Sequence, residues 1–310
     1  MSDALSLENG KSLQSATNDW YRIIQRLGSG GNAVTYLVVA TSGTNKGILF
    51  ALKIFRRLSK PERKESFRRE VEYLKQQKHP AIMRTFDEGL FRYRVDGQEN
   101  EYPFVVAEYL PQTLYHIIRA SNTSQAERIN IAVQLISALA FLEKSSPQAV
   151  HRDIKPQNIF VKGRACVLGD FGLMKLLDES DEVDRPVFKE STGPGMPFLY
   201  RTPDLVAYAK NESALTVKTD VFQLGLVLAE LFTGRNPAKR PPPDDLLVPV
   251  ELFPIGFCPG RFGPLIFQYL NQMLTQDPAQ RPTASQLMDK WLGLFTNVCE
   301  EMHNIEGRVF

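Results

Sequence analysis

The stretch His151–Phe160, HRDIKPQNIF, places an arginine, an aspartate, a lysine and an asparagine within eight residues and then returns to apolar side chains. The core of a strand or helix has no use for such a cluster. Its residue types suit a loop in which a carboxylate orients a hydroxyl group, a cation meets phosphate oxygens and an amide oxygen holds a metal ion. The stretch therefore predicts a loop for phosphoryl transfer, provided that the rest of the chain supplies the other parts.

A glycine-rich segment upstream is the first of these parts. LGSGGNAVTYL, Leu27–Leu37, lies between two segments that predict β-strands. In a dinucleotide-binding fold the glycines would open a helix, so a hairpin that covers phosphates is favoured. A plain hairpin turn is the alternative, because glycine suits any position that needs a positive φ.

A lysine inside an apolar strand is the second part. In ILFALKIF, Ile48–Phe55, the strand period places Ala51 and Lys53 on one face and the large apolar residues on the other. A lysine in such a strand needs an anionic partner. The next predicted helix supplies one, because Glu70 follows Phe67 by three residues and so shares its apolar stripe. We expect a Lys53–Glu70 pair; the alternative is that Glu70 only borders the stripe and stays solvated.

Composition narrows the class of protein. The 310 residues, of which 43% are hydrophobic, can bury a full core, and a net charge of +2 gives no general attraction to nucleic acid or anionic membrane. The longest apolar run, Val221–Phe232, is too short to span a bilayer and contains Glu230. The three cysteines are odd in number and lack metal-ligand spacing, and the N-terminus lacks the pattern of a signal peptide. These features predict a cytoplasmic protein without a nucleic-acid partner or membrane insertion; its oligomeric state is not indicated.

Two regimes of secondary structure follow one another along the chain. From about Trp20 to Val106 the pattern is mostly β, with a polar hairpin around Asp96 and Gly97 and one helix that starts in the capping box of Ser59–Glu62. After Pro111 it is largely helical, and a second capping box, Ser124–Glu127, opens a helix. The predicted class is α+β.

With these segments in place, the chain from about Tyr21 to Leu294 resembles the eukaryotic-type (Hanks-type) serine/threonine protein kinases. The likeness rests on motifs in the family's order: Gly28, Gly30 and Val34, FALK (Phe50–Lys53), HRDIKPQN (His151–Asn158), GDFGL (Gly169–Leu173), TPD (Thr202–Asp204), TDVFQLG (Thr219–Gly225) and DPAQRP (Asp277–Pro282). The resemblance implies a two-lobed kinase fold, with a small β-rich N-lobe that carries one regulatory helix and a larger, mainly helical C-lobe. The boundaries it implies are a polar N-terminal tail (1–18), a kinase domain (19–297) with its N-lobe (about 19–106), hinge (about 107–112) and C-lobe (about 113–297), and a C-terminal tail (298–310).

The resemblance also assigns roles to single residues. It implies ATP and Mg²⁺ as cofactors, with Mn²⁺ as an alternative metal. Asp153 would orient or accept the proton of the substrate hydroxyl, and Lys155 would neutralise the moving γ-phosphate. Asn158 and Asp170 would hold the metal, while Lys53, fixed by Glu70, would hold the α- and β-phosphates. The remaining implied nucleotide contacts are Gly28, Gly30, Val34, Ala51, Glu108, Leu110 and Phe160.

The implied activity is transfer of the ATP γ-phosphate to serine or threonine hydroxyls of protein substrates, including the chain itself. The alternatives are a pseudokinase that serves as a nucleotide-binding scaffold and a small-molecule phosphotransferase. We expect a regulatory phosphate on Ser191 or Thr192, opposite Arg152 and Lys175; alternatively, the acidic run Asp178–Asp184 or Glu190 already supplies the anion.

One departure from the family concerns an ion pair. The family's glutamate that pairs with the arginine at position 281 is replaced here by Asp204, which is one methylene shorter. We expect the pair with Arg281 to survive through a local backbone shift.

Overall fold

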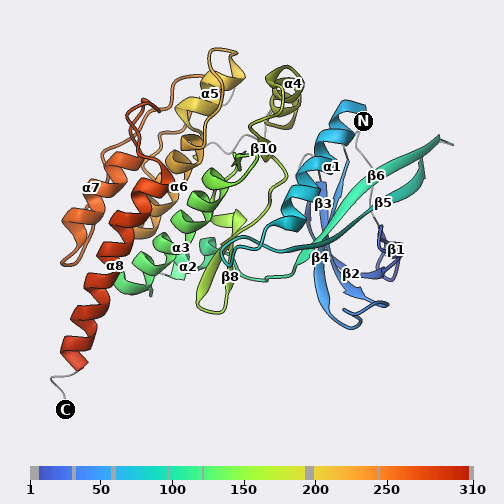
Figure 1. The fold of residues 1–310 in the computed structure, drawn as a ribbon, viewed down its shortest axis with the longest axis horizontal. Helices are drawn as coiled ribbons and strands as arrows, with labels where there is room; N and C mark the ends of the chain where they lie inside the picture. Colours follow the sequence, from blue (N-terminus) through green and yellow to red (C-terminus); the bar gives the residue numbers. More distant parts are fainter. Residues whose placement is uncertain are drawn as a thin grey trace. The chain divides into compact units, whose positions relative to one another are not determined.

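The computed structural model describes residues 7–29, 33–56, 61–95, 98–120, 122–192, 199–242 and 245–306. The chain forms two compact units. Unit 1 contains the residues up to Lys78 and Met83–Leu110, and unit 2 contains His79–Ile82 and the residues from Pro111 onward. Unit 1 is built on a β-sheet with one helix and unit 2 is largely helical, which confirms the predicted class (Figure 1).

The sheet of unit 1 has six strands in the order β1-β2-β3-β4-β6-β5, and each strand is antiparallel to its neighbours. The strands are β1 (Ser12–Gln14), β2 (Trp20–Ser29), β3 (Ala33–Ala40), β4 (Leu49–Phe55), β5 (Thr85–Val95) and β6 (Gln98–Glu108). The predicted turn at Asp96 and Gly97 lies outside the described residues, between β5 and β6.

The two faces of this sheet have different partners. One face carries an apolar cluster that includes Val34, Phe50 and Leu52. On the other face, helix α1 (Pro61–Gln76) packs through Phe67 and Val71 against Ala33 and Phe55. This division follows from strand geometry, because successive side chains point to opposite faces.

The N-terminal segment differs from the predicted polar tail. Its strand β1 pairs with β2, and Leu7 and Leu13 are buried in the apolar cluster of the sheet. The backbone N–H of Leu7 donates to the hydroxyl of Tyr36 (2.9 Å). The prediction of a tail was wrong from Leu7 onward, because two leucines in a polar stretch become a core when a neighbouring strand offers them an apolar face.

Unit 2 is made of helices and short two-stranded sheets. The helices are α2 (Leu114–Ala120), α3 (Gln125–Lys144), the 3-10 helix η1 (Pro156–Asn158), α4 (Asp181–Thr192), α5 (Pro203–Ala209), α6 (Lys218–Thr233), α7 (Gly263–Met273) and α8 (Ala284–Glu306). The paired strands are β7 (Ala149–Val150) with β10 (Lys175–Leu176) and β8 (Ile159–Lys162) with β9 (Ala165–Leu168).

The ends of these helices follow local chemistry. The predicted capping box opens α3: the hydroxyl of Ser124 accepts from the N–H of Glu127 (3.2 Å), and the carboxylate of Glu127 accepts from the N–H of Ser124 (2.9 Å). Helix α6 is buried along most of its length and ends at Gly234, whose φ of 75° suits glycine. Helix α8 continues to Glu306, beyond the predicted boundary at residue 297.

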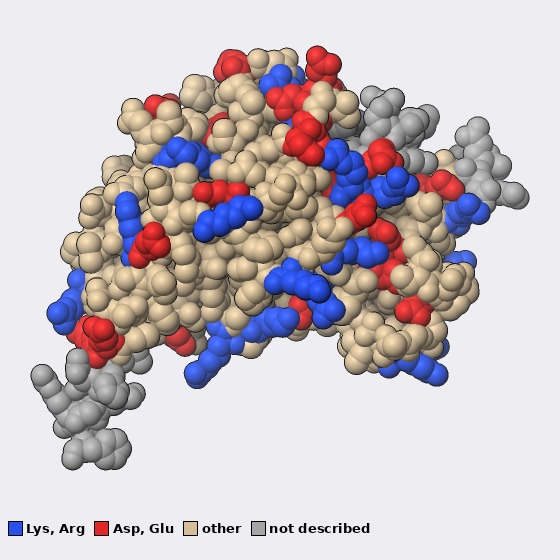
Figure 2. Space-filling model, viewed as in Figure 1, with Lys and Arg blue, Asp and Glu red and all other residues tan. Residues whose placement is uncertain are grey.

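Two further observations concern membrane-spanning helices and the distribution of surface charge. Within the described part of the chain, no helix is both long and apolar enough to span a bilayer. On the face shown in Figure 2, basic and acidic side chains are interspersed.

Candidate active site

The HRDIKPQN stretch of unit 2 follows β7: His151–Lys155 form a loop, and Pro156–Asn158 form η1. Arg152 has a φ of 67°, a conformation that non-glycine residues adopt rarely. The carboxylate of Asp220, in the first turn of α6, accepts from the backbone N–H groups of His151 (2.7 Å) and Arg152 (3.0 Å). Helix α6 begins before Asp220, with Val217 as its N-cap, so Asp220 serves the loop and does not cap the helix.

Asp153 is the centre of this loop. Its carboxylate lies 3.0 and 2.9 Å from the ammonium group of Lys155 and accepts from the amide nitrogen of Asn158 (2.8 Å). Burial raises the pKa of Asp153 and the charge of Asp170 adds to the rise, while the contacts with Lys155 and Asn158 oppose it. The loop therefore presents one buried carboxylate in a fixed orientation, next to one half-buried cation.

Asp170 lies at a second special backbone position of unit 2, with a φ of 57°. The residues before and after it are tied to the loop: a ring nitrogen of His151 lies 2.9 Å from the carbonyl oxygen of Gly169, and the rings of His151 and Phe171 are 4.5 Å apart. The backbone N–H of Gly169 donates to the carbonyl of Asn158 (2.9 Å). The segment with Asp170 and the loop with Asp153 thus form one hydrogen-bonded structure.

Unit 1 holds the other predicted catalytic residues. Lys53 is half-buried, and its ammonium group lies 5.4 Å from the centre of the Phe55 ring. Glu70 is 3% exposed, which rules out the alternative that it stays solvated. Helix α1 packs on the face of the sheet that carries Phe55, and Lys53 shares that face. Both residues therefore lie on the same side of the sheet; their pairing stays a prediction.

The role predicted for Val34 conflicts with the register of the sheet. Val34 pairs with Ile54 and belongs to the buried cluster, whereas Lys53 pairs with Thr35. Because directly opposed residues of an antiparallel pair share a face, Val34 points away from the face of Lys53 and Ala51. Val34 and Ala51 were both predicted to contact the nucleotide, but they lie on opposite faces of the sheet, so the prediction for Val34 was wrong by one residue. Thr35 holds that position, and the strand period of AVTYLVVA could have identified it.

The other predicted nucleotide contacts are described by their strand positions and burial, each within its own unit. Gly28 lies in β2 opposite Thr35, beside an irregularity in the register, and Gly30 lies outside the described residues. Glu108 ends β6 opposite Phe50, and Leu110 is half-buried. In unit 2, Phe160 is half-buried in β8, where it pairs with Val167.

Arg152 faces the acidic run of the segment that follows Asp170. Its guanidinium group makes two bonds to the carboxylate of Asp184 (2.5 and 3.1 Å), and both side chains are less than 5% exposed. It also donates to the carbonyl oxygens of Leu173 and Met174 and lies over the ring of Phe188. Burial raises the pKa of the Asp184 carboxyl, but the charge of Arg152 and the hydrogen bonds from Arg152 and Tyr208 outweigh burial and lower it.

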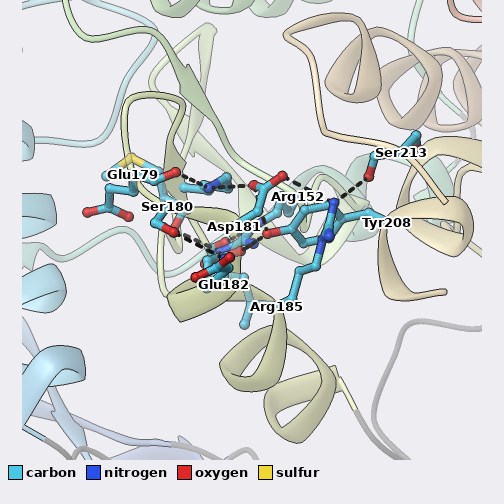
Figure 3. Close-up of polar contacts among 12 residues, drawn as sticks. Arg152, Glu179, Ser180, Asp181, Glu182, Arg185, Tyr208 and Ser213 are labelled. Carbon is cyan, nitrogen blue, oxygen red and sulfur yellow. Dashed lines mark hydrogen bonds and ion pairs between the residues drawn. The ribbon is translucent and has the colours of Figure 1, made fainter. Parts of the chain in front are cut away.

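Lys175 is paired in the same way. Its ammonium group lies 3.1 Å from the carboxylate of Asp181 and donates to the carbonyl of Glu179 (2.9 Å). The hydroxyl of Tyr208 in α5 donates to Asp184 (2.7 Å) and also lies 3.3 Å from the carboxylate of Asp181, so two helices share this cluster (Figure 3). Both cations expected to meet a phosphate are therefore occupied by carboxylates of the acidic run. Ser191 and Thr192 lie in the last turn of α4, and their side chains are outside what the structure describes.

The expected pair between Asp204 and Arg281 is present. Two hydrogen bonds of 3.1 and 3.0 Å join the guanidinium group to the carboxylate, and the side chains are 0% and 4% exposed. Asp204 is in the first turn of α5, and the hydroxyl of Thr202 caps that helix by accepting from the N–H of Leu205 (2.9 Å). The shorter side chain thus still reaches its partner.

Comparison with known proteins places this arrangement in a family. A sequence model described as Protein kinase domain matches residues 21–292. The chain belongs to the protein kinase domain family. The residues matched include most of both units and every site residue described above.

Curated relatives agree with this assignment. The chain is 27% identical over 285 residues to serine/threonine-protein kinase Nek5 of Homo sapiens, which covers 88% of this chain and 36% of the relative. It is 28% identical over 280 residues to serine/threonine-protein kinase Nek1 of Mus musculus (87% and 21%) and 28% identical over 266 residues to serine/threonine-protein kinase 36 of Pongo abelii (84% and 18%). The chain thus spans between about a fifth and a third of the length of these relatives.

Proposed function

We propose that this kinase domain transfers the γ-phosphate of ATP to serine or threonine hydroxyls of protein substrates in a Mg²⁺-dependent reaction. The observation that carries the proposal is the buried carboxylate of Asp153, held between Lys155 and Asn158. Phosphoryl transfer needs positioned charge more than covalent chemistry. A fixed carboxylate beside a cation meets that need, because it can orient a hydroxyl group while the cation neutralises the phosphate.

The residues of unit 2 fit a magnesium ion. The amide nitrogen of Asn158 donates two hydrogen bonds to Asp153, one to its backbone carbonyl oxygen and one to its carboxylate (2.8 Å each). Its amide oxygen is therefore the atom that would meet the metal, together with the carboxylate of Asp170. One carboxylate and one amide oxygen match the preference of Mg²⁺ for few protein ligands, with phosphate oxygens and water completing the shell. Mn²⁺ accepts the same ligands.

Unit 1 would hold the nucleotide. Lys53 would bind its α- and β-phosphates, and Glu70, on the same side of the sheet, would fix the ammonium group. A double-mutant cycle of Lys53→Met and Glu70→Gln tests this role: each single change should reduce phosphate transfer strongly, and the double change should cost much less than the sum. Additive losses would show that the two residues act separately.

Two alternatives predict different outcomes. A pseudokinase scaffold would bind nucleotide without transfer, and a small-molecule phosphotransferase would leave proteins unlabelled. The presence of Lys53, Glu70, Asp153, Asn158 and Asp170 disfavours the first, and the Asp-Phe-Gly segment with the Arg281 pair disfavours the second.

The direct test incubates the chain with labelled ATP, Mg²⁺ and a generic basic protein. We expect transfer to serine or threonine of that protein. Asp153→Ala and Asp170→Ala should each lower it by about 10²–10⁴-fold, the contribution of a positioned catalytic group, and Asp170→Ala should also weaken Mg²⁺-dependent nucleotide binding. Asp289→Ala, at an exposed position of α8, is the matched control and should keep full activity. Transfer that survives the Asp153 change would remove the proposed role of this residue.

Control of this activity should not need a phosphate at Arg152. The Asp184 carboxylate already pairs with Arg152, and Asp181 pairs with Lys175. These contacts favour the alternative in which the acidic run supplies the anion. Full activity after phosphatase treatment, with Ser191 and Thr192 unmodified by mass spectrometry, would support it. Loss of activity on dephosphorylation would instead support the predicted phosphate switch.

A further inference from the structure

Gln223 is a fully buried amide in α6 that makes three hydrogen bonds. Its oxygen accepts from the backbone N–H of Ile154 (2.9 Å), and its nitrogen donates to the carbonyl oxygens of Arg152 (3.0 Å) and Tyr200 (2.9 Å). The partners fix the orientation of the amide, because its oxygen meets an N–H group and its nitrogen meets two carbonyl groups.

Two of these partners flank Asp153. Together with Asp220, which lies three residues earlier on the same face of α6, Gln223 binds four backbone groups of the loop from His151 to Ile154. Asp220 accepts from the two N–H groups before Asp153, whereas Gln223 bonds on both sides of it. The left-handed backbone of Arg152 needs such support, since a residue in this conformation persists only where its surroundings hold it.

The third partner lies at the other end of the segment that begins at Asp170. Tyr200 directly precedes Arg201 and Thr202, the residues that lead into α5. Its hydroxyl donates to the carboxylate of Glu230 (2.5 Å), one further residue of α6. The backbone of this segment end is therefore joined to the backbone around Asp153 through one side chain.

We propose that Gln223 is a positioning residue that couples the orientation of Asp153 to the end of the segment at Tyr200, where a protein substrate would dock. A glutamine suits this role because one amide carries an acceptor and two N–H donors. Its loss would leave buried backbone groups without partners on both sides of the site. The inference rests on the proposed kinase function, since it assigns Gln223 to that reaction.

Two variants of Gln223 test its contacts with the loop around Asp153 and with Tyr200, and a third variant serves as a control. Gln223→Met removes every hydrogen bond at nearly constant volume. Gln223→Glu is isosteric, keeps an oxygen for the N–H of Ile154 and loses the amide donors. Gln134→Met is the matched control, because Gln134 also accepts from a backbone N–H, that of Cys166 in β9 (2.7 Å), but contacts neither Asp153 nor Tyr200.

Steady-state kinetics with a protein substrate give the first readout. We expect Gln223→Met to lower kcat by about tenfold and to raise KM for the protein substrate severalfold, with KM for ATP unchanged, because the loop around Asp153 and the segment end at Tyr200 both lose hydrogen bonds that hold their backbone. Gln134→Met should change neither constant by more than twofold. The coupling would be overturned if Gln223→Met changed kcat alone, or if Gln223→Met and Gln134→Met changed the constants equally.

Hydrogen–deuterium exchange gives a second readout that does not depend on activity. In Gln223→Met, peptides that cover 151–158 and 199–205 should both exchange faster than in the unaltered chain. In Gln223→Glu the second peptide should change as much as in Gln223→Met and the first peptide less, because the acceptor for the N–H of Ile154 remains while the donors to the carbonyl oxygens of Arg152 and Tyr200 are lost. Unchanged exchange at 199–205 in both variants overturns the inference even if the chain proves to be inactive. Inactivity of the unaltered chain, by contrast, overturns the proposed function alone.

Discussion

The sheet of unit 1 and the loop that carries Asp153 in unit 2 are held in different ways. In the sheet, alternating apolar residues such as Ile23, Leu52 and Phe104 fill one buried cluster. Around the loop, several buried side chains are polar: Asp220 and Gln223 bind backbone groups of the loop, and Arg152 binds a carboxylate. Apolar packing is non-directional and tolerates substitution by another apolar side chain of similar shape and volume. A buried polar contact requires a particular partner, so small chemical changes there should matter more.

The largest effect should come from a buried ion pair of unit 2. Arg281→Met leaves the carboxylate of Asp204 buried without its cation, and we expect about 3–5 kcal/mol of lost unfolding free energy, measured by chemical denaturation. The double variant Arg281→Met/Asp204→Leu should recover part of this loss, since it removes both charges but still lacks the hydrogen bonds that Arg281 donates to the carbonyl oxygens of Lys218 and Thr275. Equal losses in the single and double variants would show that these hydrogen bonds and packing, and not the charge pair, account for the stability.

A smaller effect is expected from the N-terminal strand. Leu13 is 3% exposed in the cluster of the sheet, so Leu13→Ala should lower the unfolding free energy by roughly 2–3 kcal/mol, the low end of the range for leucine because β1 lies at the sheet edge. Gln14→Ala, at an exposed neighbour, is the control. If both changes were neutral, residues 7–18 would behave as the tail that the sequence predicted.

The next largest loss of unfolding free energy is expected from breaking the pair between Arg152 and Asp184. Asp184→Asn keeps the shape but removes the charge, and we expect a loss of about 1.5–3 kcal/mol, as for hydrogen bonds to charged groups. The pKa of Asp184 is lowered in the folded chain, so its contribution is present above the unfolded value, about 3.9. It should disappear as the pH falls through the folded pKa.

Thermal or urea unfolding at a series of pH values checks this sign. The stability difference between the unaltered chain and Asp184→Asn should be constant near pH 7 and should shrink in acid. A difference that grew below pH 4 would contradict the lowered pKa. Asp178→Asn, at an exposed position of the same run, is the control and should show little change at any pH.

The smallest effect should come from the core of the sheet. Ile23 is 2% exposed, and Ile23→Val should cost about 0.5–1.5 kcal/mol. Phosphate transfer should be unchanged at temperatures where the variant is folded. A conservative apolar change that lowered kcat as much as Gln223→Met would erase the contrast between the two regions.

Much of the site could be predicted from the sequence because short-range patterns determine it. The capping box at Ser124 needs residues three apart, and the burial of Glu70 follows from its place on an apolar stripe. The partnership of Asp204 with Arg281 followed from a resemblance in motif order. The first two rest on local spacing, which the chain keeps wherever it folds, whereas the third joins residues 77 positions apart and needed the resemblance.

Other features depended on contacts between distant segments. Val34 and Thr35 are neighbours in sequence, and only the register with β4 decides which of them shares the face of Lys53. The acidic run could have faced solvent, as runs of like charge usually do. Instead Asp184 lies against Arg152, which is 32 residues earlier in the chain.

The sequence by itself thus determined the α+β class, the kinase motifs and the loop that carries Asp153 and Asn158; the metal site of Asn158 and Asp170 stays a prediction. Only the tertiary structure decided that β1 completes the sheet, that Asp184 occupies Arg152 and that Gln223 bonds on both sides of Asp153. The physical reason is the range of the interactions. Periodicity and capping act within a few residues, whereas a buried polar group takes its partner from whichever segment the fold brings within hydrogen-bond distance.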